Sequence, residues 1–215
     1  MAGMFIMLAA ASARAQGDLR PSVVELESRT ATGYERCAGV VTARYPQGLQ
    51  VWTAGHCANH PLSLVRFFDG HELYGSTVRV LLLSDAIDAA ELYVPVDATR
   101  AKRAQLAVRS RNVPQMGSAL TVIGHPVSAL RGPDEGRWTM TYARMGEIMS
   151  NEESGAIQYE IYCNLCGPGN SGSGVFDAAG QLVGIVYGVT ELANVAGGRL
   201  PDGLYADVVP VAALR

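Results

Sequence analysis

Short apolar runs separated by turns are the feature that most limits the folds open to this chain. Apolar and polar residues alternate over stretches such as 22–27, 137–145 and 156–162, which is the period of a half-buried β-strand. Similar runs recur from residue 22 to residue 209, and no long stretch has strong helical periodicity. Glycine is abundant, at 24 residues, and supplies tight turns. The pattern is typical of an all-β sandwich or of a pair of β-barrels.

The chain is long enough for one large domain or two small ones with a real core. Its 215 residues are 48% hydrophobic and 17% charged, which favours a globular fold over disorder. The formal net charge of −3 gives no general electrostatic attraction to nucleic acid. Residues 97–115 are rich in arginine without interleaved aromatic residues. We therefore interpret them as a solvated linker rather than an anionic docking patch.

The N-terminal residues have the pattern of an export signal. Residues 4–11 form an apolar run too short to span a bilayer, and Ala13-Arg14-Ala15 follows as an A-x-A cleavage pattern. We predict a signal peptide over residues 1–15, followed by a secreted or periplasmic domain over residues 16–215. The alternative is a frayed or buried N-terminal helix. No later run is long and apolar enough for a membrane span.

The chain has an even number of cysteines, at Cys37, Cys57, Cys163 and Cys166. Together with an export signal, an even number favours disulfides. Counting alone leaves three pairings open. Cys163 and Cys166 have the spacing of half a zinc site, but the sequence has no second close pair. We expect no metal and no cofactor.

One serine lies in a turn crowded with glycine, at residues 167–174 with the sequence GPGNSGSG. Glycine lets the backbone bend into unusual conformations and approach a ligand closely. A serine hydroxyl beside free backbone N–H groups is what an acyl-transfer nucleophile needs next to an oxyanion hole. The turn therefore supplies a candidate nucleophile, which requires a base and an orienting acid elsewhere in the chain.

A histidine and two aspartates are candidates for those roles. His56 ends an apolar strand and precedes a cysteine, and histidine suits general-base work because it loses its proton near neutral pH. Asp85 and Asp88 are both candidates for the acid that holds the base in one tautomer. The other histidines are interpreted as structural: His60, His71 and His125.

These residues resemble the motifs of a known family. Residues 53–57, TAGHC, and residues 169–173, GNSGS, look like the histidine and serine motifs of trypsin-like serine proteases. The form is that of the compact bacterial branch, including glutamyl endopeptidases and HtrA protease domains. The order His56, Asp88, Ser171 and its spacing are also similar to that branch.

Asp88 is the acid that this resemblance implies. Residues 88–92, DAAEL, resemble the family's Asp-x-Ala-x-Leu pattern. Glu91 departs from that pattern, because an apolar residue is usual there, and Asp85 therefore stays the alternative. The rejected aspartate would be a turn or cap residue.

The resemblance covers about residues 22–209 and implies the fold. The expected architecture is all-β, with two six-stranded antiparallel Greek-key β-barrels and the active site in the cleft between them. The expected divisions are a first barrel over about 20–96, a linker over about 97–115 and a second barrel over about 116–215.

The resemblance also assigns roles to individual residues. Ser171 would attack the scissile carbonyl, His56 would take its proton, and Asp88 would orient His56. The backbone N–H groups of Gly169 and Ser171 would hold the oxyanion. Asn170 stands where trypsin has an aspartate that captures a freshly cleaved N-terminus. We therefore expect activity without N-terminal trimming.

The family supports one disulfide. Cys37 and Cys57 match the pair that closes a loop beside the histidine in trypsin-like proteases. This leaves Cys163 with Cys166, a short bridge for which the family gives no support.

Substrate specificity is implied by fewer residues. Leu165 lies where trypsin-like enzymes carry the residue at the base of the pocket for the residue before the scissile bond, the S1 pocket. Val186, Tyr187 and Gly188 would form the strand against which the substrate backbone pairs. The resemblance implies an S1 preference for apolar or small residues.

The sequence thus predicts an exported serine endopeptidase with a protein or peptide substrate. We expect a monomer with no nucleic-acid partner and no stable membrane association. The alternative is a catalytically inactive protease-fold binding module. An α/β-hydrolase is set aside, because Ser173 stands where the second glycine of Gly-x-Ser-x-Gly belongs and more strand follows.

Overall fold

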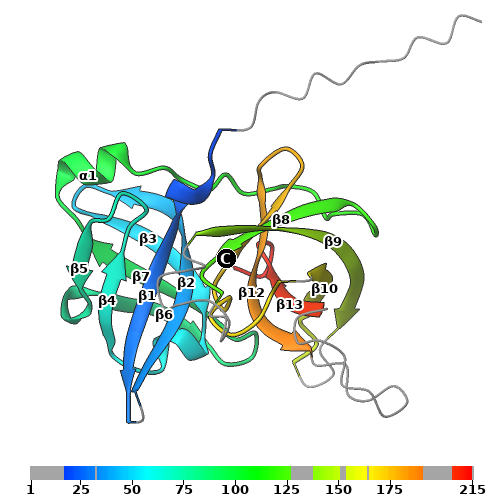
Figure 1. The fold of residues 1–215 in the computed structure, drawn as a ribbon, viewed down its shortest axis with the longest axis horizontal. Coiled ribbons are helices and arrows are strands. Elements are labelled where there is room, and N and C mark those ends of the chain that lie inside the picture. The colour runs from blue at the N-terminus through cyan, green and yellow to red at the C-terminus, as the bar shows by residue number, and fades with distance from the viewer. Residues whose placement is uncertain are drawn as a thin grey trace, which may run out of the picture.

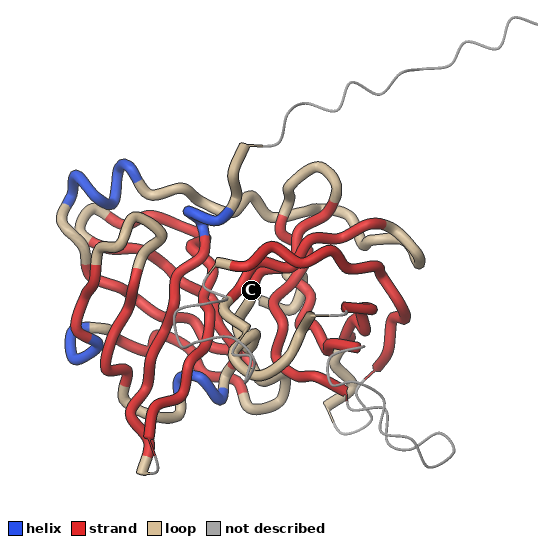
Figure 2. The backbone as a smooth tube through the Cα atoms, in the orientation of Figure 1, coloured by secondary structure: helices blue, strands red, loops and turns tan. Residues whose placement is uncertain are grey.

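The computed structural model describes residues 17–31, 33–126, 138–150, 154–163, 165–190 and 205–214, which are almost entirely β-structure (Figure 1, Figure 2). The predicted signal peptide, residues 1–15, lies outside these ranges. The helical elements are short: η1 (Arg20–Ser22), η2 (His56–Ala58), η3 (Gly75–Thr77) and α1 (Ala98–Arg103). None of the described helices has the length and hydrophobicity needed to cross a lipid bilayer.

The N-terminal half of the chain forms a curled antiparallel sheet of seven strands, in the order β5-β4-β1-β2-β3-β7-β6. The strands are β1 (Val23–Thr30), β2 (Gly33–Tyr45), β3 (Gly48–Ala54), β4 (Leu62–Arg66), β5 (Glu72–Tyr74), β6 (Arg79–Ser84) and β7 (Ala89–Pro95). Alternating apolar residues such as Leu26, Val51 and Leu92 point into its core and are at most 1% exposed.

The edges of this first sheet differ from a closed six-stranded barrel. The edge strands β5 and β6 are joined by η3 and are not paired with each other. Gly75 of η3 lies so close to Leu62 of β4 that a Cβ would overlap the Leu62 carbonyl. The start of η3 therefore packs tightly against β4. The edge strand β6 is apolar yet open to solvent, because Val80, Leu81, Leu82 and Leu83 are 42–51% exposed.

The C-terminal half forms the expected closed barrel of six strands, in the order β10-β13-β12-β11-β8-β9. The strands are β8 (Ala119–Gly124), β9 (Thr139–Ser150), β10 (Ile157–Cys163), β11 (Gly174–Asp177), β12 (Leu182–Thr190) and β13 (Tyr205–Pro210). All of its neighbouring strands pair antiparallel. The two β-structures lie side by side, with the first sheet at the left of Figure 1 and the barrel at the right.

A shared apolar cluster joins the two halves. Its larger members are Val23, Val40 and Trp52 from the first sheet and Ile123, Phe176 and Ile185 from the barrel, all at most 3% exposed. Burial of each such side chain stabilises the fold by about 1.5–3 kcal/mol. The Trp138 indole N–H adds a hydrogen bond of 2.8 Å to the Val23 carbonyl. This packing fixes the position of one half relative to the other.

The arginine-rich segment between the halves packs against both of them. It begins with α1, which is capped by the Asp97 carboxylate accepting two backbone N–H bonds of 2.8 and 2.9 Å. The Arg109 guanidinium lies 3.8 Å from the centre of the Trp52 ring. Backbone hydrogen bonds join Ala107 to β2 and residue Val108 to β12. The segment is therefore held in place along its length.

Candidate active site

His56 and Asp88 lie just beyond the paired ends of two neighbouring strands. Ala54, the last residue of β3, is opposite Ala89, the first residue of β7. The chain leaves β3 through Gly55 and enters η2 at His56, while Asp88 ends the turn that leads into β7. A Cβ at Gly55 would lie 2.8 Å from Asp88 Oδ1, so glycine allows this close approach.

The Asp88 carboxylate holds His56 by two hydrogen bonds. His56 Nδ1 lies 2.7 Å from Asp88 Oδ2, and the His56 backbone N–H donates to Asp88 Oδ1 at 2.7 Å. Asp88 adopts φ 45°, a left-handed conformation that aspartate tolerates better than most residues. Asp85 is exposed, and its backbone carbonyl accepts the Asp88 N–H at 3.4 Å. Asp88, and not Asp85, is therefore the aspartate paired with His56.

This pairing sets the charge states of both groups. The hydrogen bond that His56 donates to Asp88 raises the pKa of His56, although burial opposes the shift. Burial by itself would raise the pKa of Asp88, but the hydrogen bonds from His56 outweigh it and lower that pKa. Because an ionised carboxylate only accepts hydrogen bonds, the neutral imidazole carries its proton on Nδ1. Its Nε2 then has a lone pair available for general-base chemistry.

The serine turn is bound to both halves of the molecule. The Ala38 N–H of β2 donates to the Ser171 carbonyl at 2.7 Å, and the Gly172 N–H donates to the Val186 carbonyl of β12 at 2.7 Å. Gly172 has φ +81°, and a Cβ there would overlap the Ala38 carbonyl and Thr53 Oγ1. Thr53 in turn donates to that carbonyl at 2.6 Å. These contacts place the turn against the strands that lead to His56.

The Ser171 hydroxyl is close to this region but is not hydrogen-bonded. Across the part of the chain that the structure describes, Ser171 Oγ has no hydrogen-bond partner, His56 included. Nucleophile–base hydrogen bonds are often long in the absence of substrate and shorten when it binds. The structure therefore brings the three candidate residues to one region without closing the Ser171–His56 contact.

Two backbone N–H groups of the turn have no acceptor. Within the described ranges, the N–H groups of Gly169 and Ser171 donate to nothing. The neighbouring donors are used, since the Asn170 N–H donates to the Gly167 carbonyl at 3.0 Å and the Ser173 N–H donates to the Asn170 carbonyl at 2.9 Å. Gly169 has φ +88°, a conformation that favours glycine. The two free donors are those expected to form an oxyanion hole.

The buried Asn170 side chain forms hydrogen bonds that stabilise the serine turn. Asn170 is 3% exposed. Its Nδ2 donates to the Leu165 carbonyl at 3.3 Å, and its Oδ1 accepts from the Ser173 hydroxyl at 3.1 Å. Both ends of the buried amide are thus paired, one with the loop before the turn and one within the turn. Ser173 therefore supports the turn through Asn170, a role for which the sequence gives no signal beyond its nearness to Ser171.

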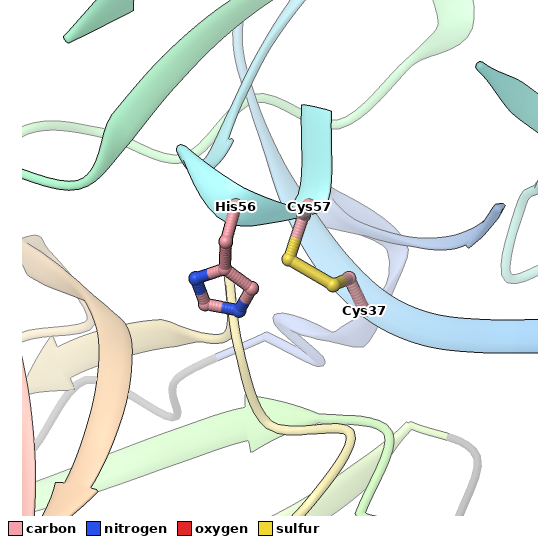
Figure 3. A group of neighbouring side chains, drawn as sticks. All are labelled: Cys37, His56 and Cys57. Carbon is pink, nitrogen blue, oxygen red and sulfur yellow. A yellow bond between two sulfur atoms is a disulfide. The ribbon is translucent and has the colours of Figure 1, made fainter. Parts of the chain in front are cut away.

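Both expected disulfides are present. Cys37 of β2 is bonded to Cys57 of η2, directly beside His56 (Figure 3). Cys163, at the end of β10, is bonded to Cys166 in the loop before the serine turn. His56 and the sulfurs of Cys37 and Cys57 are close enough to share a metal ion. Zinc binds cysteine as a thiolate, and disulfide sulfurs are not thiolates.

The residues expected to contact substrate precede and follow the serine turn in the chain. Leu165 is 56% exposed, whereas Val186 is 1% exposed and packs in the barrel core. Tyr187 lies where the register between β12 and β13 shifts, and Gly188 pairs with Asp207 of β13.

The family comparison matches the region that contains these residues. The sequence profile of the trypsin-like peptidase domain matches residues 37–185, which include His56, Asp88 and Ser171. No curated protein sequence matches the chain.

Solved proteases have the same fold. The active form of the Rv3671c protease from M. tuberculosis has a TM-score of 0.68 and 22% identity, over 91% of this chain and 78% of that one. The HtrA-type protease AlgW with a tripeptide has a TM-score of 0.66 and 20% identity, over 91% of this chain and 58% of that one. The chain thus spans little more than half of AlgW. These neighbours show that the fold is chymotrypsin-like.

Proposed function

The chain belongs to the trypsin-like peptidase domain family, and from this premise we propose that it is an exported serine endopeptidase. The observation that carries the proposal is the 2.7 Å pairing of His56 Nδ1 with Asp88 Oδ2. The pairing leaves Nε2 as a base. The serine turn with its two free N–H donors is hydrogen-bonded to β2, which the Cys37–Cys57 disulfide joins to η2. AlgW was solved with a tripeptide, and we assign a protein or peptide substrate to this chain.

The proposed reaction has two stages. His56 Nε2 takes the Ser171 hydroxyl proton as Oγ attacks the scissile carbonyl carbon, and the resulting oxyanion accepts hydrogen bonds from Gly169 and Ser171 N–H. The imidazolium, stabilised by Asp88, gives its proton to the leaving amine as the C–N bond breaks. A water then repeats the sequence on the acyl-enzyme, releasing the acid product and restoring Ser171. Each oxyanion donor contributes on the order of 3 kcal/mol to lowering the barrier.

The proposal includes export and activity that does not require N-terminal trimming. Disulfides persist in oxidising compartments, which suits the predicted signal peptide and a secreted or periplasmic location. The buried Asn170 amide is paired at both ends and requires no ion pair with a new N-terminus. We therefore expect the mature chain to be active without N-terminal trimming.

The direct test compares wild type with Ser171→Ala. We expect wild type to hydrolyse casein and to be labelled by a sulfonyl fluoride on the peptide that contains Ser171. Ser171→Ala should lose the label and at least about 10³-fold in kcat, because no nucleophile remains. Ser76→Ala, at an exposed serine in η3, should behave as wild type. Equal hydrolysis by wild type and Ser171→Ala would end the proposal.

The open Ser171–His56 contact favours one alternative, a catalytically inactive module that binds peptides. Such a module would bind peptides with the same affinity in wild type and Ser171→Ala, and neither protein would release products or react with the sulfonyl fluoride.

A further inference from the structure

Strand β6 (Arg79–Ser84) lies at one edge of the first sheet, and its outer side is open. It is paired with β7 alone, and no other backbone group in the described ranges forms a hydrogen bond with it. A hollow of about 380 Å³ adjoins it, lined by Val80, by Leu62 of β4 and by Gly75 of η3. The described chain therefore leaves the outer N–H and C=O groups of β6 free, and such a row is a template for another strand.

The side chains of β6 are apolar on both faces. The register between β6 and β7 shifts between Val80 and Leu82, so that Val80 lies opposite Leu92 and Leu82 lies opposite Glu91. All four residues of Val80–Leu83 remain 42–51% exposed. Edge strands are usually protected by charged residues or proline, and this run has neither. Its composition is that of a strand with neighbours on both sides.

One charge of each sign flanks the apolar run. Arg79 begins β6 and Asp85 directly follows it, each three residues from Leu82. Both are exposed, and within the described residues neither forms an ion pair. The Arg79 guanidinium stacks on the Tyr93 ring, 4.5 Å from its centre. The stacking holds the guanidinium in place, while its N–H groups can still donate in the guanidinium plane.

This arrangement of charges is complementary to a second copy of itself. If two β6 strands pair antiparallel about a two-fold axis at Leu82, Arg79 faces Asp85 of the partner subunit at both ends. Leu81 then faces Leu83 of the partner subunit, with about 4.5–5.5 Å between opposite Cβ atoms. Parallel pairing in register would instead bring the two arginines together and the two aspartates together, which is unfavourable.

We propose that the protein forms a two-fold homodimer in which the β6 strands of two copies pair antiparallel and join the two first sheets into one. From the sequence we expected a monomer, and the open apolar edge changes that expectation. The contact is small, because each copy brings four side chains that are already half buried. We therefore expect a weak dimer, with a Kd of about 10–100 μM. The proposal goes beyond the proposed protease function and does not depend on it.

The test is sedimentation velocity of the whole protein from about 1 to about 300 μM, a range that brackets this Kd. We expect the wild-type sedimentation coefficient to rise with concentration from that of a monomer to that of a dimer. Arg79→Asp and Asp85→Arg each place like charges at both ends of the contact and should raise the Kd by about 10-fold or more. Leu82→Lys places two ammonium groups at the axis and should abolish the dimer.

Mixing the two charge variants tests the register directly. Arg79→Asp has an acid at both ends of β6, and Asp85→Arg has an arginine at both ends, so opposite charges meet only in the mixed pair. An equimolar mixture should form heterodimers with about the wild-type Kd, and the double variant should dimerise again. Two controls at exposed positions outside β6 should keep the wild-type Kd: Arg103→Asp and Val113→Lys. Far-UV circular dichroism and urea unfolding show whether each variant is folded.

Three results would overturn the inference. A wild type that stays monomeric over the whole concentration range has no such contact. A dimer that persists in Leu82→Lys is formed by another surface. Charge variants that do not associate when mixed, while wild type dimerises, exclude antiparallel pairing centred on Leu82. If monomeric wild type instead binds an apolar strand-forming peptide and Leu82→Lys does not, the edge belongs to a peptide and not to a second copy.

Discussion

At the scale of single residues, the pairing of His56 with Asp88 gives a pH-dependent prediction. Asp88→Asn removes the carboxylate that selects the Nδ1–H tautomer, so we expect kcat at neutral pH to fall by about 10³- to 10⁴-fold. Asp88 also raises the pKa of His56 above 6.5. Wild-type kcat/KM should therefore fall on the acid side at a pH above 6.5, and the fall should move to lower pH in the variant.

The same pair makes the free energy of unfolding depend on pH. The raised pKa of His56 contributes stability below its unfolded value of 6.5, which is lost as pH rises through the folded value. The lowered pKa of Asp88 contributes stability above its unfolded value of 3.8, which is lost as pH falls through the folded value. The unfolding free energies of wild type and Asp88→Asn, measured in urea, should differ most between pH 3.8 and 6.5. A constant difference from pH 3 to pH 9 would contradict this, with Asp85→Asn as the control.

The residues proposed for the candidate site come from the sequence, but the contacts that hold them do not. The histidine and serine motifs are contiguous, so the residues around His56 and Ser171 can be recognised without a structure. The pairing of Gly188 with Asp207 cannot be recognised in this way. It depends on which strand pairs with β12 and in which register. Periodicity assigns a residue to a face of a strand and gives no information on the neighbouring strand.

At the scale of elements, the serine turn depends on close packing at Gly172. Gly172 and Gly70 have nearly the same backbone, with φ +81° and φ +80°, but a Cβ at Gly70 meets nothing within 4 Å. Gly70→Ala should therefore cost only about 1–2 kcal/mol for the left-handed conformation. Gly172→Ala adds an overlap with the Ala38 carbonyl and should cost about 3 kcal/mol or more.

The two variants should differ more in kcat/KM than in their free energy of unfolding. Gly172→Ala shifts the turn that carries Ser171, and a displacement of about 1 Å can cost on the order of 10²-fold in rate. Gly70→Ala lies in the turn between β4 and β5 and should keep wild-type kcat/KM. Urea unfolding and peptide hydrolysis on both variants check this, and equal losses in the two proteins would contradict it.

The strands themselves were largely predictable, with one informative exception. Alternation marks one face as buried, and β9 and β10 largely follow this rule. In contrast, β1 and β3 are buried on both faces over most of their length. The continuous apolar run in β6 is typical of a strand buried on both faces. In the structure, its residues Val80–Leu83 are 42–51% exposed. A run of this kind has no period that distinguishes a central strand from an edge strand.

At the scale of the whole molecule, the shared apolar cluster predicts cooperative unfolding. Trp52 belongs to the first sheet, and Trp138 precedes β9 of the barrel while donating a hydrogen bond to Val23 of the first sheet. Because both halves bury residues in the same cluster, we expect one urea transition, with coincident curves from tryptophan fluorescence and far-UV circular dichroism. Two separated transitions would show that the halves unfold independently.

The two-part architecture followed from the resemblance, but the way the first half closes did not. A family likeness implies how strands follow one another, and the chymotrypsin-like neighbours agree with it. The edge strands β5 and β6 are not paired, and between them a glycine at position 75 lets the turn lie against Leu62. A local contact of this kind is a property of this chain and not of the family.

The Cys37–Cys57 disulfide has a consequence for where the fold is completed. It joins β2, whose Ala38 holds the serine turn, to η2, which begins with His56. In the reducing cytosol this bond does not persist, and η2 then lacks its covalent link to β2. On the proposed export, the disulfide forms only in the oxidising compartment, and we expect the attachment of η2 to β2 to be completed there.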